Sequence, residues 1–327
     1  MTNFYREKDA DPAALSGSTV AVLGYGNLGR SVAANLRDSG VAVVVGNRHD
    51  EYRVIAESDG FPALSIDAAA AAADLCYVLL PDEVIPECFR SEIGHSIRPG
   101  AAVCFASGYA LAYGLIQPPQ GLDVLLLAPR MLGEEVRHRY QVSAGYWSYL
   151  SVERDATGKG WDRLLGLAAA IGALRRGALE LSAQQEALLD LFVEQSVGAV
   201  LGTALLLGFE VGVEAGLPPE ALVIELYQSG EMARTFQTFA DQGFLPSISA
   251  HGLTASFGGF LSTLAIDRAA MERHFRQTLT DIERGHFAAR FQQEQENGYP
   301  TLTAIRAITA EDNPMTLAER RVRAAVD

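Results

Sequence analysis

The sequence predicts an α/β domain with a doubly wound, mainly parallel sheet, followed by an all-α domain. Between Thr19 and about Val152, short β-branched apolar runs alternate with alanine-rich helical stretches, which is typical of parallel β-α-β units. After Ser182 the strand pattern stops, and long helical patterns separated by Gly and Pro continue nearly to the end. Ser182 and Gln185 fit a capping box that starts a new helix, so we predict domains of residues 1–181 and 182–327.

The predicted strands are unbroken apolar runs, as a sheet covered by helices on both faces requires. They comprise residues 19–23, 41–45, 75–80, 101–105, 124–127 and 149–152. Helices are predicted between them, including residues 27–38 and 66–73. The order of these elements favours a sheet built from consecutive crossover units.

Composition and charge exclude several classes of protein. A chain of 327 residues with 49% hydrophobic and 20% charged residues can form two domains with cores. The formal net charge of −14 leaves no excess of cations for a phosphate backbone or an anionic membrane, so neither nucleic acid nor a membrane is expected as a partner. The uncharged run in the second half, residues 195–209, is short for a bilayer span and is interrupted by Gly, Ser and Thr.

The termini and the cysteines favour a cytoplasmic protein. Residues 1–11 are polar and contain no apolar signal segment. Cys76, Cys88 and Cys104 lie in or beside apolar runs without the spacing of a zinc site. We therefore expect three buried free thiols in a reducing compartment.

A glycine-rich loop follows the first predicted strand and leads directly into an amphipathic helix. Its G-x-G-x-x-G pattern is formed by Gly24, Tyr25, Gly26, Asn27, Leu28 and Gly29. In a Rossmann domain the first glycine permits the tight turn, the second lets the backbone approach a pyrophosphate, and the third lets helix and strand pack closely. The helix N-terminus favours the phosphate charge. The first domain is therefore predicted to bind NAD(P).

The end of the second strand leaves the choice of cofactor open. It lacks the terminal acid that would bind a ribose 2′-hydroxyl, and Arg48 in this region favours a 2′-phosphate. Asp50 and Glu51 in the same loop would repel such a phosphate. Both NADP and NAD remain candidates.

Three carboxylates are predicted to lie on one face of an apolar helix. Asp190 and Glu194 are four residues apart, and Glu186 lies one turn before them. Ionised groups in such an apolar segment need a partner. A metal or a substrate would provide one, and so would solvent at the helix edge or an arginine of the first domain.

Several motifs, in this order along nearly the whole chain, resemble the short bacterial form of the ketol-acid reductoisomerases, also called acetohydroxy acid isomeroreductases. Besides the glycine loop they are YREKDAD at residues 5–11, NLRDSG at 35–40, LLPDEV at 79–84, RPGA at 98–101 and DLFVEQ at 190–195. Ser247-Ile248-Ser249 is similar to the family's substrate-contacting serine loop. The resemblance implies a Rossmann domain followed by the helical domain of that family.

The resemblance also implies an activity and a set of site residues. The enzyme would isomerise an acetohydroxy acid by a magnesium-assisted alkyl shift and then reduce the product with NADPH. It would be a homodimer with intertwined helical domains and shared active sites. Magnesium would be held by Asp190, Glu194 and the Glu225 of the partner subunit. Beyond the glycine loop and Arg48, the implied cofactor contacts are Leu80, Pro81, Asp82, Gly108 and Gly133, and the implied substrate contacts are Glu225 and Ser249. His251, beside the serine loop, is a further candidate for contact with the substrate, as a proton donor in place of the family's histidine, or is a surface or packing histidine.

Three residues depart from the family pattern where its chemistry takes place. Ser107 replaces a histidine, Arg130 replaces a lysine, and Ser229 replaces the second metal-binding glutamate of a later helix. The alkyl shift needs a pair of dications and a proton relay, whereas hydride transfer needs a positioned nicotinamide and one electrophile. Arg130 could clamp a substrate carboxylate or act as that electrophile, and Ser107 could bind the substrate or the nicotinamide amide. Both could instead be structural.

We therefore predict an NAD(P)H-dependent reductase that acts on a C=O or C=N bond of a small acid without the isomerase step, in a specialised biosynthetic pathway. Arg130, Ser107, Asp190 and Glu194 are its candidate catalytic residues. One alternative is a genuine magnesium-dependent reductoisomerase acting on 2-acetolactate, in which Glu231 or a water replaces the absent glutamate. A second alternative is a protein that binds NAD(P) without catalysis.

Overall fold

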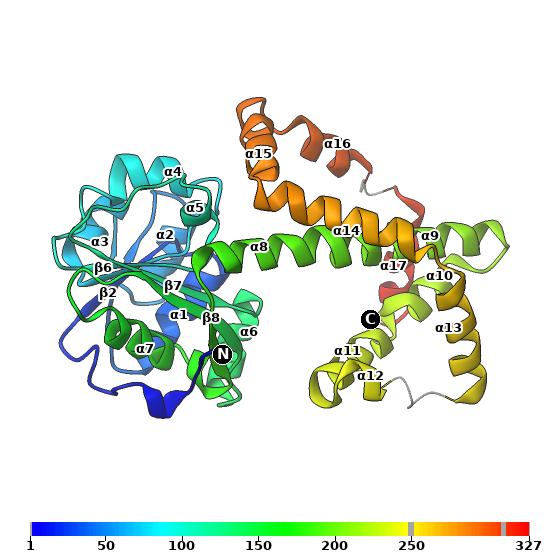
Figure 1. Ribbon diagram of the computed structural model, residues 1–327, viewed down its shortest axis with the longest axis horizontal. Helices are drawn as coiled ribbons and strands as arrows, with labels where there is room; N and C mark the ends of the chain where they lie inside the picture. The colour runs from blue at the N-terminus through cyan, green and yellow to red at the C-terminus, as the bar shows by residue number, and fades with distance from the viewer. Residues whose placement is uncertain (1, 248–251, 309–311, 327) are drawn as a thin grey trace. The chain divides into compact units, whose positions relative to one another are not determined.

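The computed structural model of the chain describes residues 2–247, 252–308 and 312–326. The chain forms two compact units, Met1–Asp190 and Leu191–Asp327 (Figure 1). The first unit is an α/β domain and the second is helical, as predicted. All three cysteines are buried free thiols, which confirms that prediction.

The first unit contains a nine-stranded sheet in the order β1-β9-β8-β7-β6-β5-β2-β3-β4. The six strands that follow one another in the sheet as β4, β3, β2, β5, β6 and β7 pair in parallel. In contrast, β8 is antiparallel to β7, and β1 is antiparallel to β9. The strands are β1 (Phe4–Tyr5), β2 (Thr19–Leu23), β3 (Ala42–Gly46), β4 (Ala63–Leu64), β5 (Leu75–Val78), β6 (Ala102–Phe105), β7 (Asp123–Pro129), β8 (Trp147–Arg154) and β9 (Gly177–Glu180). The sheet is therefore doubly wound and mainly parallel.

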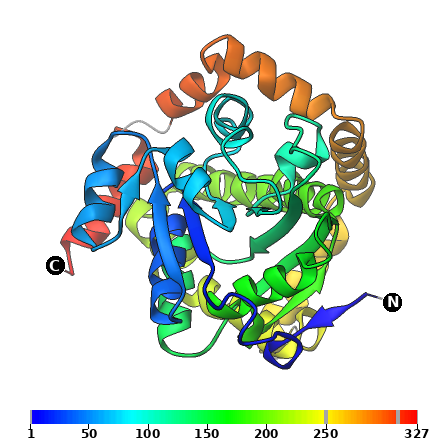
Figure 2. The ribbon, with the colours of Figure 1, turned by 90° about the vertical axis from the view of Figure 1, so that its left-hand side faces the viewer.

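Helices cover both faces of this sheet (Figure 2). Successive strand residues point to opposite sides, and since both sets are apolar, both faces must be buried. In β2, Val20 and Val22 belong to one buried cluster, and Ala21 and Leu23 belong to another. The first cluster packs against α1 (Asn27–Asp38), α6 (Gly133–Gln141) and α7 (Gly160–Ala170). The second packs against α3 (Ile66–Ala72), α4 (Ile85–Cys88) and α5 (Tyr109–Ala112). Each fully buried aliphatic side chain contributes roughly 1.5–3 kcal/mol.

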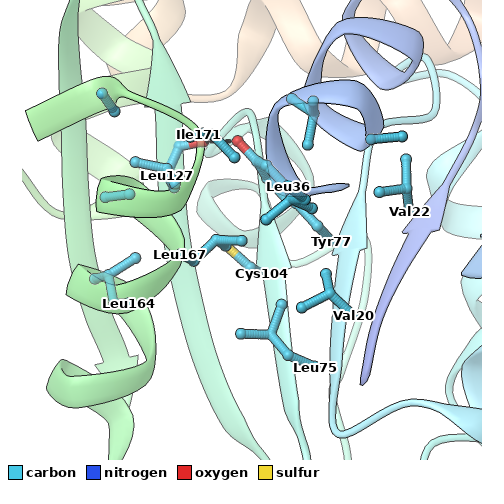
Figure 3. Packing of buried hydrophobic residues seen from close by; sticks show 14 of the residues in the cluster. Val20, Val22, Leu36, Leu75, Tyr77, Cys104, Leu127, Leu164, Leu167 and Ile171 are labelled. Carbon is cyan, nitrogen blue, oxygen red and sulfur yellow. Dashed lines mark hydrogen bonds between the residues drawn. The ribbon is translucent and has the colours of Figure 1, made fainter. Parts of the chain in front are cut away.

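The first cluster also contains a hydrogen-bonded polar group, the hydroxyl of Tyr77. Figure 3 shows the Tyr77 side chain reaching past Leu36 toward Leu127. The Tyr77 hydroxyl donates to the Leu127 carbonyl at 2.6 Å, so its burial leaves no unsatisfied donor there. Strands β5 and β7, which flank β6 in the sheet, are thereby linked across it.

The three strands that the sequence did not predict, β1, β4 and β9, have two to four residues each. Such short segments carry too little alternation to be recognised. The predicted boundaries of the other strands differ from the observed ones by a few residues. For example, β5 ends at Val78, two residues before the predicted end at Leu80.

The second unit consists of helices with a small core of its own. Phe209, Val223 and Ala318 form its buried cluster. Its elements are η4 (Glu194–Gly198), α9 (Ala199–Glu214), α10 (Pro219–Val223), η5 (Ile224–Gln228), α11 (Glu231–Gln242), α12 (Phe244–Ser247), α13 (Leu253–Ala265), α14 (Arg268–Glu283), α15 (His286–Glu296), α16 (Pro300–Ile308) and α17 (Pro314–Ala324).

The helix that starts the second half exposes many apolar side chains. α8 (Ala183–Val193), η4 and α9 form one continuous helix of 32 residues, Ala183–Glu214. By length and composition alone it passes the test for a membrane-spanning helix, and the predicted uncharged run 195–209 is only part of it. Leu206, Leu207 and Val211 are 53%, 52% and 61% exposed. Exposed apolar side chains gathered in this way are typical of interaction surfaces.

Candidate active site

The glycine loop has the geometry that its three glycines predict. Gly24 has φ of 101°, and a Cβ there would lie 2.7 Å from the Leu79 carbonyl oxygen. A Cβ on Gly29 would lie 2.0 Å from the Gly24 carbonyl oxygen, so only glycine permits this packing. Gly26 is the N-cap of α1, and no atom lies within 4 Å of its Cβ position. The loop therefore forms an open cradle at a helix N-terminus, which fits a dinucleotide pyrophosphate.

The other residues predicted around this loop have different surroundings. The side chain of Tyr25 is buried, and its hydroxyl donates to Asp59 Oδ2 at 2.9 Å. The Leu80 side chain borders the Gly24 position, and a Cβ on Gly133 would lie 2.6 Å from the Leu28 nitrogen. Asn27 and Pro81 are exposed. Their roles in cofactor binding stay predictions.

A polar cluster lies at the carboxyl ends of β5 and β6. The Ser107 hydroxyl donates to Asp82 Oδ2 at 3.2 Å and accepts the Tyr109 N–H at 3.2 Å. The Gly108 N–H donates to Glu186 Oε2 at 2.7 Å. A Cβ on Gly108 would lie 2.1 Å from the Ala183 carbonyl oxygen. Glycine at this position therefore lets α8 start directly against the turn after β6.

Arg130, the residue after β7, joins this cluster through two carboxylates of α8. Its Nη2 donates to Glu186 Oε1 at 3.0 Å, and its Nη1 donates to Asp190 Oδ1 at 2.5 Å. The guanidinium lies 5.2 Å from the ring centroid of Tyr149, within the range of a cation–π contact. The Arg130 Nε is buried and has no hydrogen-bond partner within the described ranges. This arrangement fixes a positive charge at the carboxyl edge of the sheet.

Glu186 is the residue of this cluster whose role the sequence did not assign. Its side chain is only 1% exposed and bridges the Gly108 N–H and Arg130. Burial raises the pKa of Glu186 to about 7, against the opposing effects of the Gly108 N–H and the Arg130 guanidinium. In the sequence, Glu186 was indicated only by its position one turn before Asp190 on an apolar helix.

The carboxylates predicted to bind metal divide between the two units. Asp190 pairs with Arg130, so the arginine partner that the sequence left as an alternative is present. Glu194 begins η4 and Glu225 lies in η5, both π-helical segments with exposed side chains. Within residues 2–247, 252–308 and 312–326, no group of three or more His, Cys, Asp or Glu side chains is arranged to hold a metal ion. The described carboxylates of one chain therefore do not fit a complete metal site, and the metal assignment stays a prediction.

The remaining predicted residues are placed as follows. Ser229 follows η5, and its hydroxyl accepts the Glu231 N–H at 3.3 Å. Arg48 is exposed and pairs with Asp50. Ser249 and His251 lie outside the described residues.

Comparison with known families covers both halves of the chain. Residues 14–177 match the family model of the acetohydroxy acid isomeroreductase NADPH-binding domain, and residues 184–327 match that of the ketol-acid reductoisomerase C-terminal domain. The chain belongs to the ketol-acid reductoisomerase family. The resemblance found in the sequence is confirmed, and the protein is an NAD(P)-dependent oxidoreductase.

Individual ketol-acid reductoisomerases are similar over nearly their full length. The enzyme of Caldivirga maquilingensis, named ketol-acid reductoisomerase (NADP(+)), is 37% identical over 93% of each chain. That of Tropheryma whipplei, with the same name, is 35% identical over 99% of this chain and 97% of its own. A solved NADH-preferring ketol-acid reductoisomerase from an uncultured archean is 30% identical, covers 98% of each chain and has a TM-score of 0.93. The predicted fold class is therefore confirmed.

Within this member of the family the three departures from the family pattern have distinct settings. Ser107 and Arg130 belong to the cluster around Glu186 in the first unit. Ser229 lies in the second unit, between η5 and α11. The first two are held by hydrogen bonds to acidic side chains, Asp82 for Ser107 and Glu186 with Asp190 for Arg130.

Proposed function

We propose that this enzyme carries out the complete ketol-acid reductoisomerase reaction on 2-acetolactate: a magnesium-dependent alkyl shift followed by reduction with NAD(P)H. The observation that carries the proposal is the similarity, over nearly the full length, to relatives named for that reaction. Asp190, Glu194 and Glu225 are retained at the positions where the family resemblance predicts metal ligands. This reverses the order of preference that the sequence alone favoured.

The fixed charge of Arg130 suits the reductive step of this reaction. Hydride transfer to a carbonyl carbon places negative charge on the carbonyl oxygen, and a preorganised cation beside that oxygen stabilises the transition state. Both ends of the guanidinium donate to carboxylates of α8, so it is oriented before substrate binds. We therefore assign Arg130 to this electrostatic role rather than to a bidentate clamp on the substrate carboxylate.

A second candidate function is reduction without the alkyl shift. It is favoured by the ion pair between Arg130 and Asp190, because this contact uses a carboxylate oxygen that a metal ion would otherwise bind. Serine at positions 107 and 229, in place of a histidine and a glutamate, points in the same direction. The substrate would then be a keto acid or imine that needs no rearrangement.

One experiment separates these candidates. NAD(P)H oxidation by the full chain is followed with 2-acetolactate and, separately, with the rearranged 3-hydroxy-3-methyl-2-oxo acid, with magnesium or with a chelator. The complete reaction predicts turnover of both substrates, with 2-acetolactate requiring magnesium. Turnover of only the rearranged acid would establish the second candidate. Binding of NAD(P)H without turnover of these or other keto acids and imines would support the non-catalytic alternative.

We also propose that the enzyme is a cytoplasmic homodimer with shared active sites and that it binds neither nucleic acid nor a membrane. The exposed apolar residues of α9 support a protein partner, since burial of such a surface against a second copy is favourable. Sedimentation of the full chain tests this: a monomer at micromolar concentration, or cosedimentation with lipid vesicles, would contradict it.

A further inference from the structure

The loop between β3 and α2 (Glu51–Ser58) is organised around one carboxylate, that of Asp50. Its Oδ1 accepts the Asn47 Nδ2–H at 2.7 Å and the backbone N–H groups of Tyr52 and Arg53 at 3.1 and 3.3 Å. Its Oδ2 accepts from Arg48 Nε at 2.7 Å. Asp50 is thus both the N-cap of α2 and the counter-ion of Arg48.

This loop is tied directly to the glycine cradle. The backbone N–H of Tyr25 donates to Asn47 Oδ1 at 3.1 Å, and the Gly24 N–H donates to the Gly46 carbonyl at 2.9 Å. In a Rossmann domain, the end of the strand that follows the glycine loop and its helix lies beside the adenosine ribose. The residues after Gly46 are therefore those that meet the ribose 2′ position.

The groups that could attract a 2′-phosphate here already form hydrogen bonds or ion pairs within the first unit, most of them with Asp50. The helix N-terminus of α2 offers its N–H groups and its positive dipole end, and Asp50 accepts the N–H groups of its second and third residues, Tyr52 and Arg53. Arg48 is 81% exposed, and its guanidinium pairs with the same carboxylate. Arg53 donates to the Ala63 carbonyl at 3.1 Å and pairs with Glu57. Glu51 adds a further negative charge to the first turn.

Asp50 is ionised at neutral pH. Partial burial acts to raise its pKa, but the hydrogen bonds from Arg48 and the Arg53 N–H outweigh that effect and lower the pKa below its usual value. A 2′-phosphate carries close to two negative charges at pH 7, so placing it here brings like charges together. A ribose 2′-hydroxyl, in contrast, can donate to an ionised carboxylate.

We propose that Asp50 makes this enzyme prefer NADH over NADPH. Three N–H groups donate to Oδ1, whereas among the described residues Oδ2 accepts from Arg48 and retains a lone pair for the 2′-hydroxyl. The inference deepens the proposed function, because it assumes that the glycine cradle binds a nicotinamide dinucleotide. It also sets this chain apart from the relatives whose names specify NADP(+).

The test is calorimetric titration of the full chain with NADH and with NADPH, without substrate. Wild-type protein is expected to bind NADH at least about tenfold more tightly, a difference of about 1.4 kcal/mol. In Asp50→Asn the affinity for NADPH should rise about tenfold and that for NADH should fall a few-fold, since one negative charge and one strong acceptor are removed. Asparagine caps helices as well as aspartate does, so α2 should persist.

Glu51→Gln is the matched control, because it removes the same charge from the adjacent, exposed residue. It should change the ratio of the two dissociation constants by less than about threefold. An equal effect of Glu51→Gln and Asp50→Asn would overturn the assignment of Asp50, and so would tighter binding of NADPH by the wild type. If neither nucleotide binds, the proposed function itself fails, which is a different result from binding with the opposite preference.

A double-mutant cycle adds a measurement specific to the ion pair. Arg48→Gln in the wild type should alter NADPH affinity by less than about threefold, because the guanidinium is already paired with Asp50. In the Asp50→Asn background the same change should remove most of the gained NADPH affinity, because the released guanidinium is then the phosphate partner. Additive effects of the two substitutions would contradict the proposal. Should Asp50→Asn fail to fold, wild-type titration with ADP-ribose and its 2′-phosphate still tests the preference.

Discussion

The glycine cradle and the Arg130 cluster lie in the same unit, but they are built in different ways. The cradle consists of backbone, and its shape depends on hydrogen atoms at Gly24 and Gly29 where any larger group would collide. The cluster consists of charged side chains from β7 and α8, and its shape depends on the balance between ion pairing and burial. The cradle should therefore respond to changes of volume, and the cluster to changes of charge and pH.

The largest effect is expected at Gly29. In Gly29→Ala the new Cβ would lie 2.0 Å from the Gly24 carbonyl oxygen, so the loop must move. We expect loss of NAD(P)H binding by at least about 100-fold and a decrease in unfolding free energy of about 1–3 kcal/mol. Calorimetric titration and urea denaturation measure the two effects.

Gly26→Ala is the control for that substitution. Because nothing lies within 4 Å of its Cβ position, the folded chain can accept the methyl group. We expect unchanged unfolding free energy together with weakened dinucleotide binding, since the methyl group occupies the approach of the pyrophosphate. Equal destabilisation by the two substitutions would mean that the third glycine has no special steric role.

Arg130→Met should have the largest effect within the charged cluster. The change leaves the buried Glu186 without its cation, and we expect a loss of about 3 kcal/mol in unfolding free energy at pH 8. At pH 6 the loss should be smaller, because an unpaired Glu186 is then largely protonated. Arg90→Met, which breaks an ion pair with both side chains 72% exposed, should cost less than about 0.5 kcal/mol at either pH. Equal losses of unfolding free energy in both variants would show that burial does not strengthen the effect of removing the cation.

The pH dependence of stability provides a third measure of the cluster. The pKa of Glu186 is raised from 4.5 to about 7 in the folded chain. Its contribution to stability is thus fully present below about pH 4.5 and is lost as the pH rises through about 7. The difference in unfolding free energy between wild type and Glu186→Gln should change over this window. A difference that does not vary with pH would contradict the raised pKa of Glu186. Glu87→Gln, at the exposed surface, is the control and should give no pH-dependent difference in unfolding free energy.

A smaller effect is expected at Ser107. Its hydroxyl joins Asp82 to the Tyr109 N–H, so Ser107→Ala should lower stability by about 1 kcal/mol. If Ser107 also contacts the substrate or the nicotinamide, kcat/KM should fall by clearly more than the fraction of folded enzyme explains. Unchanged kcat/KM would leave Ser107 with a structural role alone. Steady-state kinetics beside thermal denaturation distinguishes these results.

The features that could be predicted from the sequence are those set by neighbouring residues. The capping box is present, since the Gln185 N–H donates to Ser182 Oγ and the Ser182 N–H donates to Gln185 Oε1. The glycine roles also follow from local geometry. The link between Arg130 and Glu186 joins residues 56 positions apart, and no local pattern determines such a pair. The capping of α2 by Asp50 was visible only as two acids near Arg48, because its hydrogen bonds depend on where Asn47 lies.

The close approach at Gly108 has a consequence for recombining halves of related enzymes. Ala183, Glu186 and Ala187 are buried, so the first turns of α8 pack within the unit Met1–Asp190. A chimaera joined after residue 182 would exchange these turns and separate Glu186 from both Gly108 and Arg130. A junction after Asp190 would keep all of these contacts within one parent sequence.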